Sequence, residues 1–300
     1  MRASEFNNRR QQLMEQVGHN NIAIIASASV RTRNRDVDYP FRQDSDFYYL
    51  TGFNEADALA VFIPGRKQGE YILFCQEFDE KKALWEGAHA GLEGATQDYG
   101  ADDSFPIDDL NDILPGLLEN KNKVFYPMGR DSDLDHHLME WISLIRSQTR
   151  SGINAPGELV SLEHILHEMR LIKSPAEIKL MQKAIDVSAK GHIRAMQRCK
   201  PGRYEYQIEG EMVHEFIDHG LRAVAYPSIV AGGDNACILH YTENKAILKE
   251  GDLLLIDAGA ECDHYAADIA RTFPVNGVFS TEQKLLYNLV LDAQLAAMQE

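Results

Sequence analysis

The sequence predicts two domains, an α/β domain over residues 1–172 and an α+β domain over residues 173–300. Three observations carry this prediction. A chain of 300 residues is long enough to bury two hydrophobic cores. Short apolar runs alternate with helical stretches up to about residue 148, which is typical of an α/β domain. After residue 161 long amphipathic helices come first and strand-like runs follow, which is typical of an α+β domain.

Four apolar runs of the first domain are expected to be strands because polar turn residues bound each of them. They are NIAIIASAS (21–29), ALAVFIPG (58–65), YILFC (71–75) and KVFYP (123–127). Between the third and the fourth, the stretch FDEKKALWEGAHAG (78–91) has helical character.

The second domain opens with a long predicted helix. Ser174 is a suitable N-cap, Pro175 suits the first helical position, and Glu177 completes a capping box. The apolar stripe expected to face the core consists of Ile178, Met181, Ile185 and Ile193. A second helix is predicted from Tyr204 to His219, with Gly220 as its stop signal.

An antiparallel meander is expected after these helices. Its strands are SIVAGG (228–233), CILHYT (237–242), AILK (246–249), DLLLIDAGA (252–260) and YAADIARTFPV (265–275). A last helix begins with a second capping box, formed by Ser280 and Gln283, and meets no stop signal before Glu300. We therefore expect the chain to be the front part of a longer protein.

The composition excludes several classes of partner. A formal net charge of −16 and a pI near 5.1 argue against nucleic acid or an anionic membrane, since both would repel the chain. No apolar run approaches the roughly 20 residues that span a bilayer, and no signal peptide is recognisable. The four cysteines lack any C-x-x-C spacing, which disfavours a disulfide framework or a zinc–thiolate site. These features predict a cytoplasmic protein.

Two aspartates stand within otherwise apolar strands, Asp257 and Asp268. If their strands form a hairpin with a two-residue turn at Cys262 and Asp263, the two carboxylates oppose each other on one face. Like charges so placed repel, so either a shared proton or bound cations must compensate them. In the alternative register, one or both aspartates face solvent and need no compensation.

Two carboxylates cannot complete the shells of two divalent ions, which take further oxygen or imidazole ligands. The second domain contains five histidines, and His240 is the one on a predicted strand next to the hairpin. From its position alone, His240 is equally well explained as a hydrogen-bonded core residue and as a catalytic one.

Several motifs in order along the chain resemble those of the Xaa-Pro aminopeptidases (aminopeptidase P). They are DVDYPFRQDSDFYYLTGFNEADA (36–58), LHEMRLIKSPAEI (166–178), ILHYTEN (238–244), LLLIDAGAE (253–261) and YAADIARTFPVNG (265–277). Creatinase and prolidase are relatives of this family. The resemblance implies a creatinase-like N-terminal domain and a pita-bread metallopeptidase domain of the M24 type, of which only the first half is present here.

The resemblance also implies roles for individual residues. Asp257 would bind one divalent metal ion and Asp268 would bridge two, with manganese as the expected metal. His240 would contact the substrate near the scissile bond, and Tyr226 would line the substrate pocket. Trp85 resembles an aromatic that reaches the active site of a neighbouring subunit, which implies a homo-oligomer, a dimer or a tetramer. The alternative for Trp85 is a partly buried side chain on its own helix.

The expected activity is release of the N-terminal residue from peptides with proline in second position. The family's remaining ligands, one histidine and two glutamates, would belong to a second half that this sequence does not contain. Two alternatives stay open: a prolidase or creatinase-like hydrolase of the same fold, and a non-catalytic protein that uses the scaffold to bind a peptide.

Overall fold

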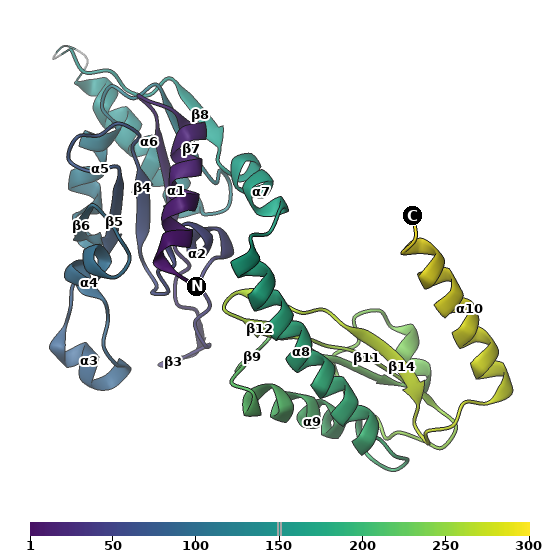
Figure 1. The fold of residues 1–300 in the computed structure, drawn as a ribbon. Helices are drawn as coiled ribbons and strands as arrows, with labels where there is room; N and C mark the ends of the chain where they lie inside the picture. Colours follow the sequence, from purple (N-terminus) through teal and green to yellow (C-terminus); the bar gives the residue numbers. More distant parts are fainter. Residues whose placement is uncertain (149, 151) are drawn as a thin grey trace. The chain divides into compact units, whose positions relative to one another are not determined.

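The structure is a computed structural model that describes every residue except Thr149 and Ser151. Its contacts divide the chain into two compact units, Met1–Lys173 and Ser174–Glu300 (Figure 1). Each unit has β-sheet structure and a hydrophobic core of its own. Within the described part of the chain, no helix is long and apolar enough to cross a membrane.

The first unit is built on a six-stranded mixed sheet with the order β6-β5-β4-β1-β7-β8. The pairs β1–β7, β7–β8 and β5–β6 are parallel, whereas β4 is antiparallel to β1 and β5. The strands are β1 (Ile22–Ala26), β4 (Leu59–Phe62), β5 (Tyr71–Cys75), β6 (Asp103–Pro106), β7 (Lys123–Tyr126) and β8 (Glu158–Ser161). The predicted α/β architecture is confirmed, and the four predicted strands correspond to β1, β4, β5 and β7.

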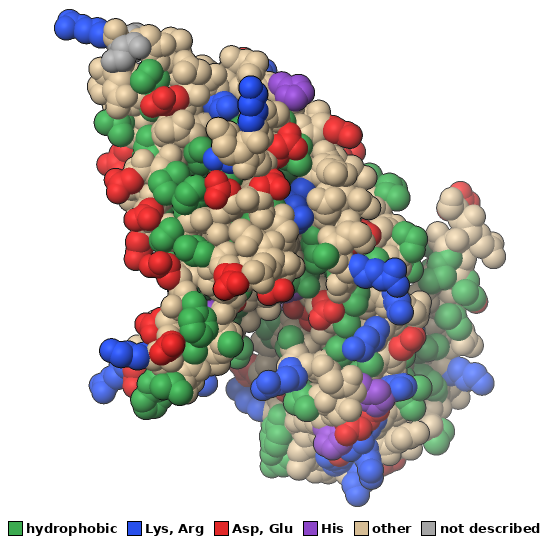
Figure 2. Space-filling model, turned by 60° about the vertical axis from the view of Figure 1, so that its left-hand side comes forward, with side chains coloured by type: hydrophobic (Ala, Val, Ile, Leu, Met, Phe, Trp, Pro, Cys, Tyr) green, Lys and Arg blue, Asp and Glu red, His purple; other side chains and the backbone are tan. Residues whose placement is uncertain are grey.

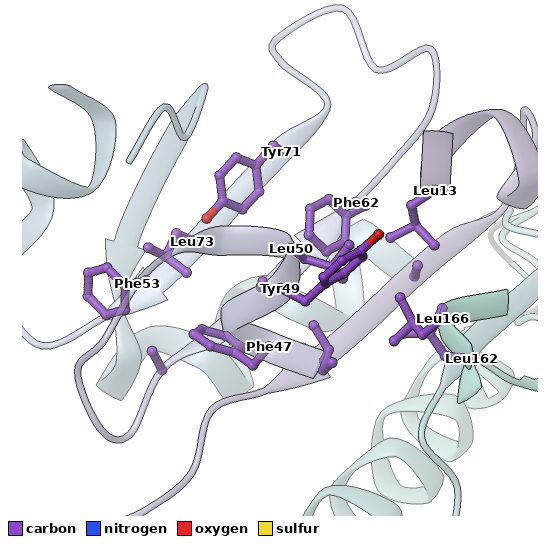
Figure 3. Close-up of a cluster of buried hydrophobic side chains, with 14 of the residues drawn as sticks. Leu13, Phe47, Tyr49, Leu50, Phe53, Phe62, Tyr71, Leu73, Leu162 and Leu166 are labelled. Carbon is purple, nitrogen blue, oxygen red and sulfur yellow. The ribbon is translucent and has the colours of Figure 1, made fainter. Parts of the chain in front are cut away.

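Helices cover both faces of this sheet, because successive strand side chains point to opposite sides. Ala23 and Ile25 belong to the core cluster shown in Figure 3, while Ile22 and Ile24 belong to a second cluster on the other face. The first cluster includes residues of α1 (Ala3–Val17), α2 (Ser45–Thr51), α4 (Gly91–Gln97) and α7 (Glu163–Leu171). The second includes residues of α5 (Leu110–Leu118) and α6 (Ser132–Ser147).

Two segments of the first unit contribute nothing to its core. The predicted helical stretch 78–91 is divided, because α3 (Glu80–Glu86) ends at Gly87, whose φ is +96°. Helix α3 has no buried residue, and the ribbon of β2 (Thr32–Asn34) and β3 (Val37–Asp38) is exposed throughout. Figure 2 shows many acidic side chains over the visible face of this unit, in keeping with the net charge of −16.

The second unit packs two antiparallel helices and two small sheets around one core. The helices are α8 (Pro175–Arg198) and α9 (Glu205–Asp218). One sheet has the order β10-β11-β14 (Ile229–Gly232, Leu253–Asp257, Ala270–Pro274), and the other has the order β13-β12-β9 (Tyr265–Ala266, Ala260–Cys262, Ala223–Val224). Helix α10 (Thr281–Ala297) follows β14, and none of its residues is buried. Both predicted capping boxes, at Ser174 and at Ser280, are present.

The predicted apolar stripe of α8 is wrong. Ile178, Ile185 and Ile193 are exposed and Met181 is only partly buried, whereas most of the buried residues are small or polar. The buried residues are Glu177, Ala184, Val187, Ser188, Gly191, His192 and Ala195. The reason is close packing: a Cβ on Gly191 would lie 2.6 Å from the Phe216 ring of α9, so this face has no room for larger side chains.

Two strands of the predicted meander are absent from the described residues. Residues 237–249 form the end of a 3-10 helix (Gly233–Cys237) and an irregular loop, in which only Ile247 makes an isolated bridge, with Tyr204. Within this loop the Glu205 carboxylate accepts from Ala246 N, and the Asn244 side chain accepts from Val230 N of β10, so side chains take the place of a strand partner.

Candidate active site

Asp257 and Asp268 lie on the same side of the second unit's sheet structure and share one hydrogen-bond partner. Asp257 is the last residue of β11, and Asp268 stands two residues before β14 (Figure 1). The Tyr226 hydroxyl lies 2.5 Å from Asp257 Oδ1 and 3.0 Å from Asp268 Oδ1. The two carboxylates therefore lie close enough together for a single hydroxyl group to contact both of them.

The strand register differs from the predicted one by two residues. Asp257 is paired with Ala270 rather than with Asp268, and Cys262 is paired with Tyr265. The turn is Asp263-His264, whose φ angles of +47° and +69° are those of a type I′ hairpin turn. Because side chains alternate with a period of two, a shift of two residues keeps both aspartates on one face. The register prediction was wrong, although the shared face is present.

Gly259 makes the close approach of these strands possible. The backbone bonds from Ala258 N to Ile269 O and from Ala267 N to Ala260 O place Gly259 opposite Asp268. A Cβ on Gly259 would lie 1.8 Å from the carbonyl oxygen of Ala267, which no side chain tolerates. Glycine is therefore required here, between the two aspartate-bearing segments.

Helix α8 fixes the backbone on both sides of Gly259. The Ser188 hydroxyl accepts from Ala260 N at 2.9 Å and donates to Ala184 O at 2.7 Å. One turn later, His192 Nε2 lies 3.1 Å from Ala258 O. Burial lowers the pKa of His192, so the imidazole is neutral and donates to that carbonyl. Ser188 and His192, two of the buried polar residues of α8, thus hold the strand end that presents Asp257.

The pair of carboxylates carries more negative charge than its surroundings compensate. A phenol has one proton and can donate fully to only one of the two carboxylates at a time. Burial, and then the hydrogen bonds to Asp257 and Asp268, raise the pKa of Tyr226 well above its usual value, so it remains a donor. Among the residues that the structure describes, neither aspartate forms an ion pair with a lysine or arginine.

Clustered carboxylate oxygens are the ligands that hard divalent cations prefer, so Asp257 and Asp268 fit a metal of this kind. Within the described residues, no group of three or more histidine, cysteine, aspartate or glutamate side chains is arranged to hold a metal ion. Asp257 and Asp268 are thus two candidate ligands, and the described residues bring no third one to them.

His240 is separated from the aspartate pair in sequence and lies on a different kind of element than predicted. It occupies the irregular loop after the 3-10 helix, with its side chain exposed between Leu239 and the buried Tyr241. The structure gives no hydrogen bond between His240 and either aspartate. The prediction that His240 lies on a strand was wrong, because this loop is held by side chains rather than by a neighbouring strand.

Trp85 lies on α3 of the first unit and is 89% exposed. Its neighbour Leu84 is 85% exposed as well. The alternative of a partly buried side chain on its own helix is therefore wrong. An indole so exposed makes no contribution to the core of its own unit.

Sequence reasoning missed three polar residues that support this region: Ser188, His192 and Glu205. Each is buried, and each bonds to a segment that bears a candidate site residue. Ser188 and His192 are four residues apart, which places them on one helix face, and that spacing was the available signal. Nothing in the local sequence distinguishes Glu205 from the other glutamates of its helix.

Two family profiles match the chain. The profile described as "Aminopeptidase P, N-terminal domain" matches residues 6–126, and "Metallopeptidase family M24" matches residues 179–300. One match lies in each unit of the structure.

Individual relatives agree with these profiles. The Xaa-Pro aminopeptidase of Escherichia coli is 41% identical over 290 residues, which are 96% of this chain and 66% of the relative. The structure of Pseudomonas aeruginosa aminopeptidase PepP is 55% identical with a TM-score of 0.97, covering 99% of this chain and 67% of that one. A zinc-substituted Escherichia coli aminopeptidase P in complex with product gives a TM-score of 0.96 at 39% identity, covering 100% and 68%. The chain thus spans about two thirds of the length of these relatives.

Proposed function

The chain belongs to the aminopeptidase P family of M24 metallopeptidases, and from this premise we propose that the full-length protein is a metal-dependent aminopeptidase. Its substrates are peptides with proline in second position, from which it releases the N-terminal residue. The observation that carries the proposal is the pair Asp257 and Asp268, which share a single phenolic donor and have no cationic partner among the described residues. A protein that only bound peptides would have no need to hold two carboxylates in this way.

We propose that Asp257 and Asp268 hold two divalent cations, with manganese as the working metal. The family membership supports the use of divalent metal, and so does the zinc-substituted relative. When bound, such cations supply Lewis acidity, which activates water and polarises a carbonyl group. Asp257 and Asp268 suit such cations because, among the described residues, their four carboxylate oxygens share a single hydrogen-bond donor, the Tyr226 hydroxyl.

The chain's own residues have three roles in this proposal. The Tyr226 hydroxyl lies within hydrogen-bond distance of both carboxylates and donates its one proton to either of them, which keeps both beside the same point. His240 projects from its loop, contacts the substrate near the scissile bond and stabilises the charge that develops on the carbonyl oxygen. Ser188 and His192 keep the strand end of Asp257 in position from behind.

Trp85 belongs to the proposal through a second copy of the chain. Its exposed indole, beside the exposed Leu84, suits a contact with another subunit's peptide site in a homo-dimer or homo-tetramer. Trp85→Ala is expected to raise KM for the peptide while leaving the fold of the unit intact, since α3 contributes nothing to the core. Size-exclusion chromatography with light scattering gives the oligomeric state. We place the protein in the cytoplasm, in line with four cysteines that are all free.

The alternatives are less well supported. The relatives reported above are named for Xaa-Pro aminopeptidase or aminopeptidase P activity, which does not favour a prolidase, a creatinase-like hydrolase or a non-catalytic binder. Cleavage of peptides longer than two residues separates an aminopeptidase from a prolidase. Activity that requires metal separates it from a creatinase-type enzyme.

The test is release of the first residue from an Xaa-Pro-containing tripeptide by the full-length protein with added manganese. Metal catalysis supplies several kcal/mol of transition-state stabilisation, so Asp268→Ala should lower kcat/KM by more than about 1000-fold. Calorimetric titration with manganese should show two ions per chain in the wild type and a loss of tight uptake in the variant. Unchanged turnover in Asp268→Ala would remove the proposal.

A further inference from the structure

We propose that Glu205 is a positioning residue that fixes the loop carrying His240. This inference rests on the proposed function, because it concerns how that site is built. Glu205 is the first residue of α9 and is completely buried. A buried carboxylate is costly unless hydrogen bonds compensate its charge, so the identity of its donors shows what it holds together.

All four donors that the structure gives to the Glu205 carboxylate come from one segment, residues 232–246. Oε1 accepts from Gly232 N at 2.8 Å and from Asn235 Nδ2 at 3.0 Å. Oε2 accepts from the Tyr241 hydroxyl and from Ala246 N, both at 2.8 Å. A carboxylate offers about four lone-pair positions, and this segment occupies all of them.

The position of these donors along the loop is informative. Gly232 and Ala246 lie at the two ends of the segment, and Tyr241 is the residue directly after His240. The Glu205 side chain on helix α9 therefore joins the two ends of the loop and also holds Tyr241, the residue next to His240. Burial, and then the bond to Glu205, raise the pKa of Tyr241, so this hydroxyl stays a donor.

A second buried side chain fixes the same loop from the sheet. Asn244 has a φ of +48°, accepts from Val230 N at 3.0 Å and donates to Ser228 O at 2.8 Å. Between these attachments the tip projects outward: Leu239 is 89% exposed, and His240 is exposed too. A loop with fastened ends and an exposed histidine at its tip is suited to present that histidine to a ligand in one orientation.

The sharpest substitution is Glu205→Gln, which keeps the shape of the side chain. Each carboxylate oxygen serves one backbone N–H, Gly232 N on one side and Ala246 N on the other. Whichever way the amide is turned, its NH₂ group faces a backbone N–H that cannot reorient. The base of the loop is therefore disturbed. Among the described residues, Glu205 accepts no hydrogen bond from the segments that carry Asp257 and Asp268, and the nearest link is Gly232, which pairs with Leu254 three residues before Asp257.

The matched control is Glu211→Gln on the same helix. Glu211 pairs with Arg194 and Arg203, outside the loop. In the full-length protein with manganese and an Xaa-Pro tripeptide, Glu205→Gln should lower kcat/KM about 10- to 100-fold, because small misplacements of a contacting group have effects of this size. Manganese affinity should stay the same. Glu211→Gln should keep kcat/KM within about twofold, since surface substitutions rarely disturb distant geometry.

A double-mutant cycle with His240→Ala tests whether Glu205 acts through His240. If it does, Glu205→Gln causes no further loss of kcat/KM once His240 is absent. A loss of the same size in both backgrounds, or no loss in the wild-type background, would overturn the proposal. If Glu205→Gln does not fold, Tyr241→Phe takes its place in the same cycle, because it removes one donor and leaves the carboxylate's other three.

Hydrogen exchange separates this proposal from the proposed function. Glu205→Gln should raise amide exchange in peptides covering residues 232–246, and Glu211→Gln should not. If the wild-type protein cleaves no Xaa-Pro peptide, the proposed function fails. Faster exchange of residues 232–246 in Glu205→Gln would still support the inference that Glu205 fixes this loop. If the wild type is active and exchange in the loop is unchanged, the inference about Glu205 fails by itself.

Discussion

Asp46 in the first unit and the pair Asp257–Asp268 in the second show two different uses of carboxylates. Asp46 is 2% exposed and binds two arginines, Arg130 at 2.8 Å and Arg170. Asp257 is partly buried and Asp268 is exposed, and they share one tyrosine proton. The first carboxylate is compensated by its own chain, whereas the pair is not.

This difference distinguishes a structural carboxylate from one that suits a ligand. Asp46 joins α2 to Arg130 and to α7, and its charge is neutralised where it lies. At the aspartate pair, Gly259, helix α8 and the Tyr226 hydroxyl hold two like charges close together. Among the described residues, no lysine or arginine pairs with them. A fold that holds like charges together without compensating them suits the cation site that we propose there.

The largest expected effect is on stability, and its sign should differ between the two regions. Asp46→Asn should lower the free energy of unfolding by about 3 kcal/mol, near the low end for a broken buried pair because both arginines are partly exposed. Asp268→Asn should raise that free energy by a few tenths of a kcal/mol in metal-free protein, because it relieves repulsion. Urea denaturation of both variants measures this, and a destabilised Asp268→Asn would contradict the comparison.

Manganese should stabilise the second unit, and this effect should depend on Asp257 and Asp268 but not on Asp46. Manganese at 100 times its dissociation constant should add about 2.7 kcal/mol, for each ion bound, to the unfolding free energy of the full-length protein. Asp257→Asn and Asp268→Asn should each abolish that increment, whereas Asp46→Asn should retain it. Thermal unfolding with and without manganese gives the measurement. An increment that survives in Asp268→Asn would show that the ion binds elsewhere.

Gly259→Ala should disturb the backbone between the two aspartates. The added Cβ would lie 1.8 Å from Ala267 O, so we expect a loss of about 2 kcal/mol and weaker manganese binding. Gly210→Ala on α9 is the control, since its Cβ meets open space and a helical alanine should add roughly 0.5–1 kcal/mol. Equal effects of the two substitutions on manganese affinity would rule out this role of Gly259.

The smallest expected effect concerns pH. Burial lowers the pKa of His192 below its value in the unfolded chain. As the pH falls, the unfolded state therefore binds more protons than the folded state. The stability from the neutral imidazole is complete well above the unfolded pKa of about 6.5 and declines as the pH falls through it, by at most about 0.7 kcal/mol between pH 7 and 6. His192→Asn should remove this component. Unfolding curves at both pH values test it, and an identical pH dependence in the variant would contradict it.

Local sequence signals predicted much of the fold. The capping boxes at Ser174 and Ser280 depend on residues three positions apart, and both helices begin where those signals lie. The shared face of Asp257 and Asp268 was also predictable, because it depends only on the alternation of strand side chains. The exact register was not, since it is determined by a turn whose residues, Asp263 and His264, both adopt positive φ.

What the sequence by itself determined about this protein is its two fold classes in order, the starts of helices α8 and α10, and the two acidic residues that its sheet structure presents together. Those features depend on neighbours within a few residues. Only the tertiary structure decided which face of α8 is buried. The face that contains Gly191 packs closely against Phe216 of α9, and the isoleucines of the predicted stripe stay exposed. It also decided that Glu205 holds the loop of His240, because its donors lie 27 to 41 residues away and only the folded chain brings them to one carboxylate.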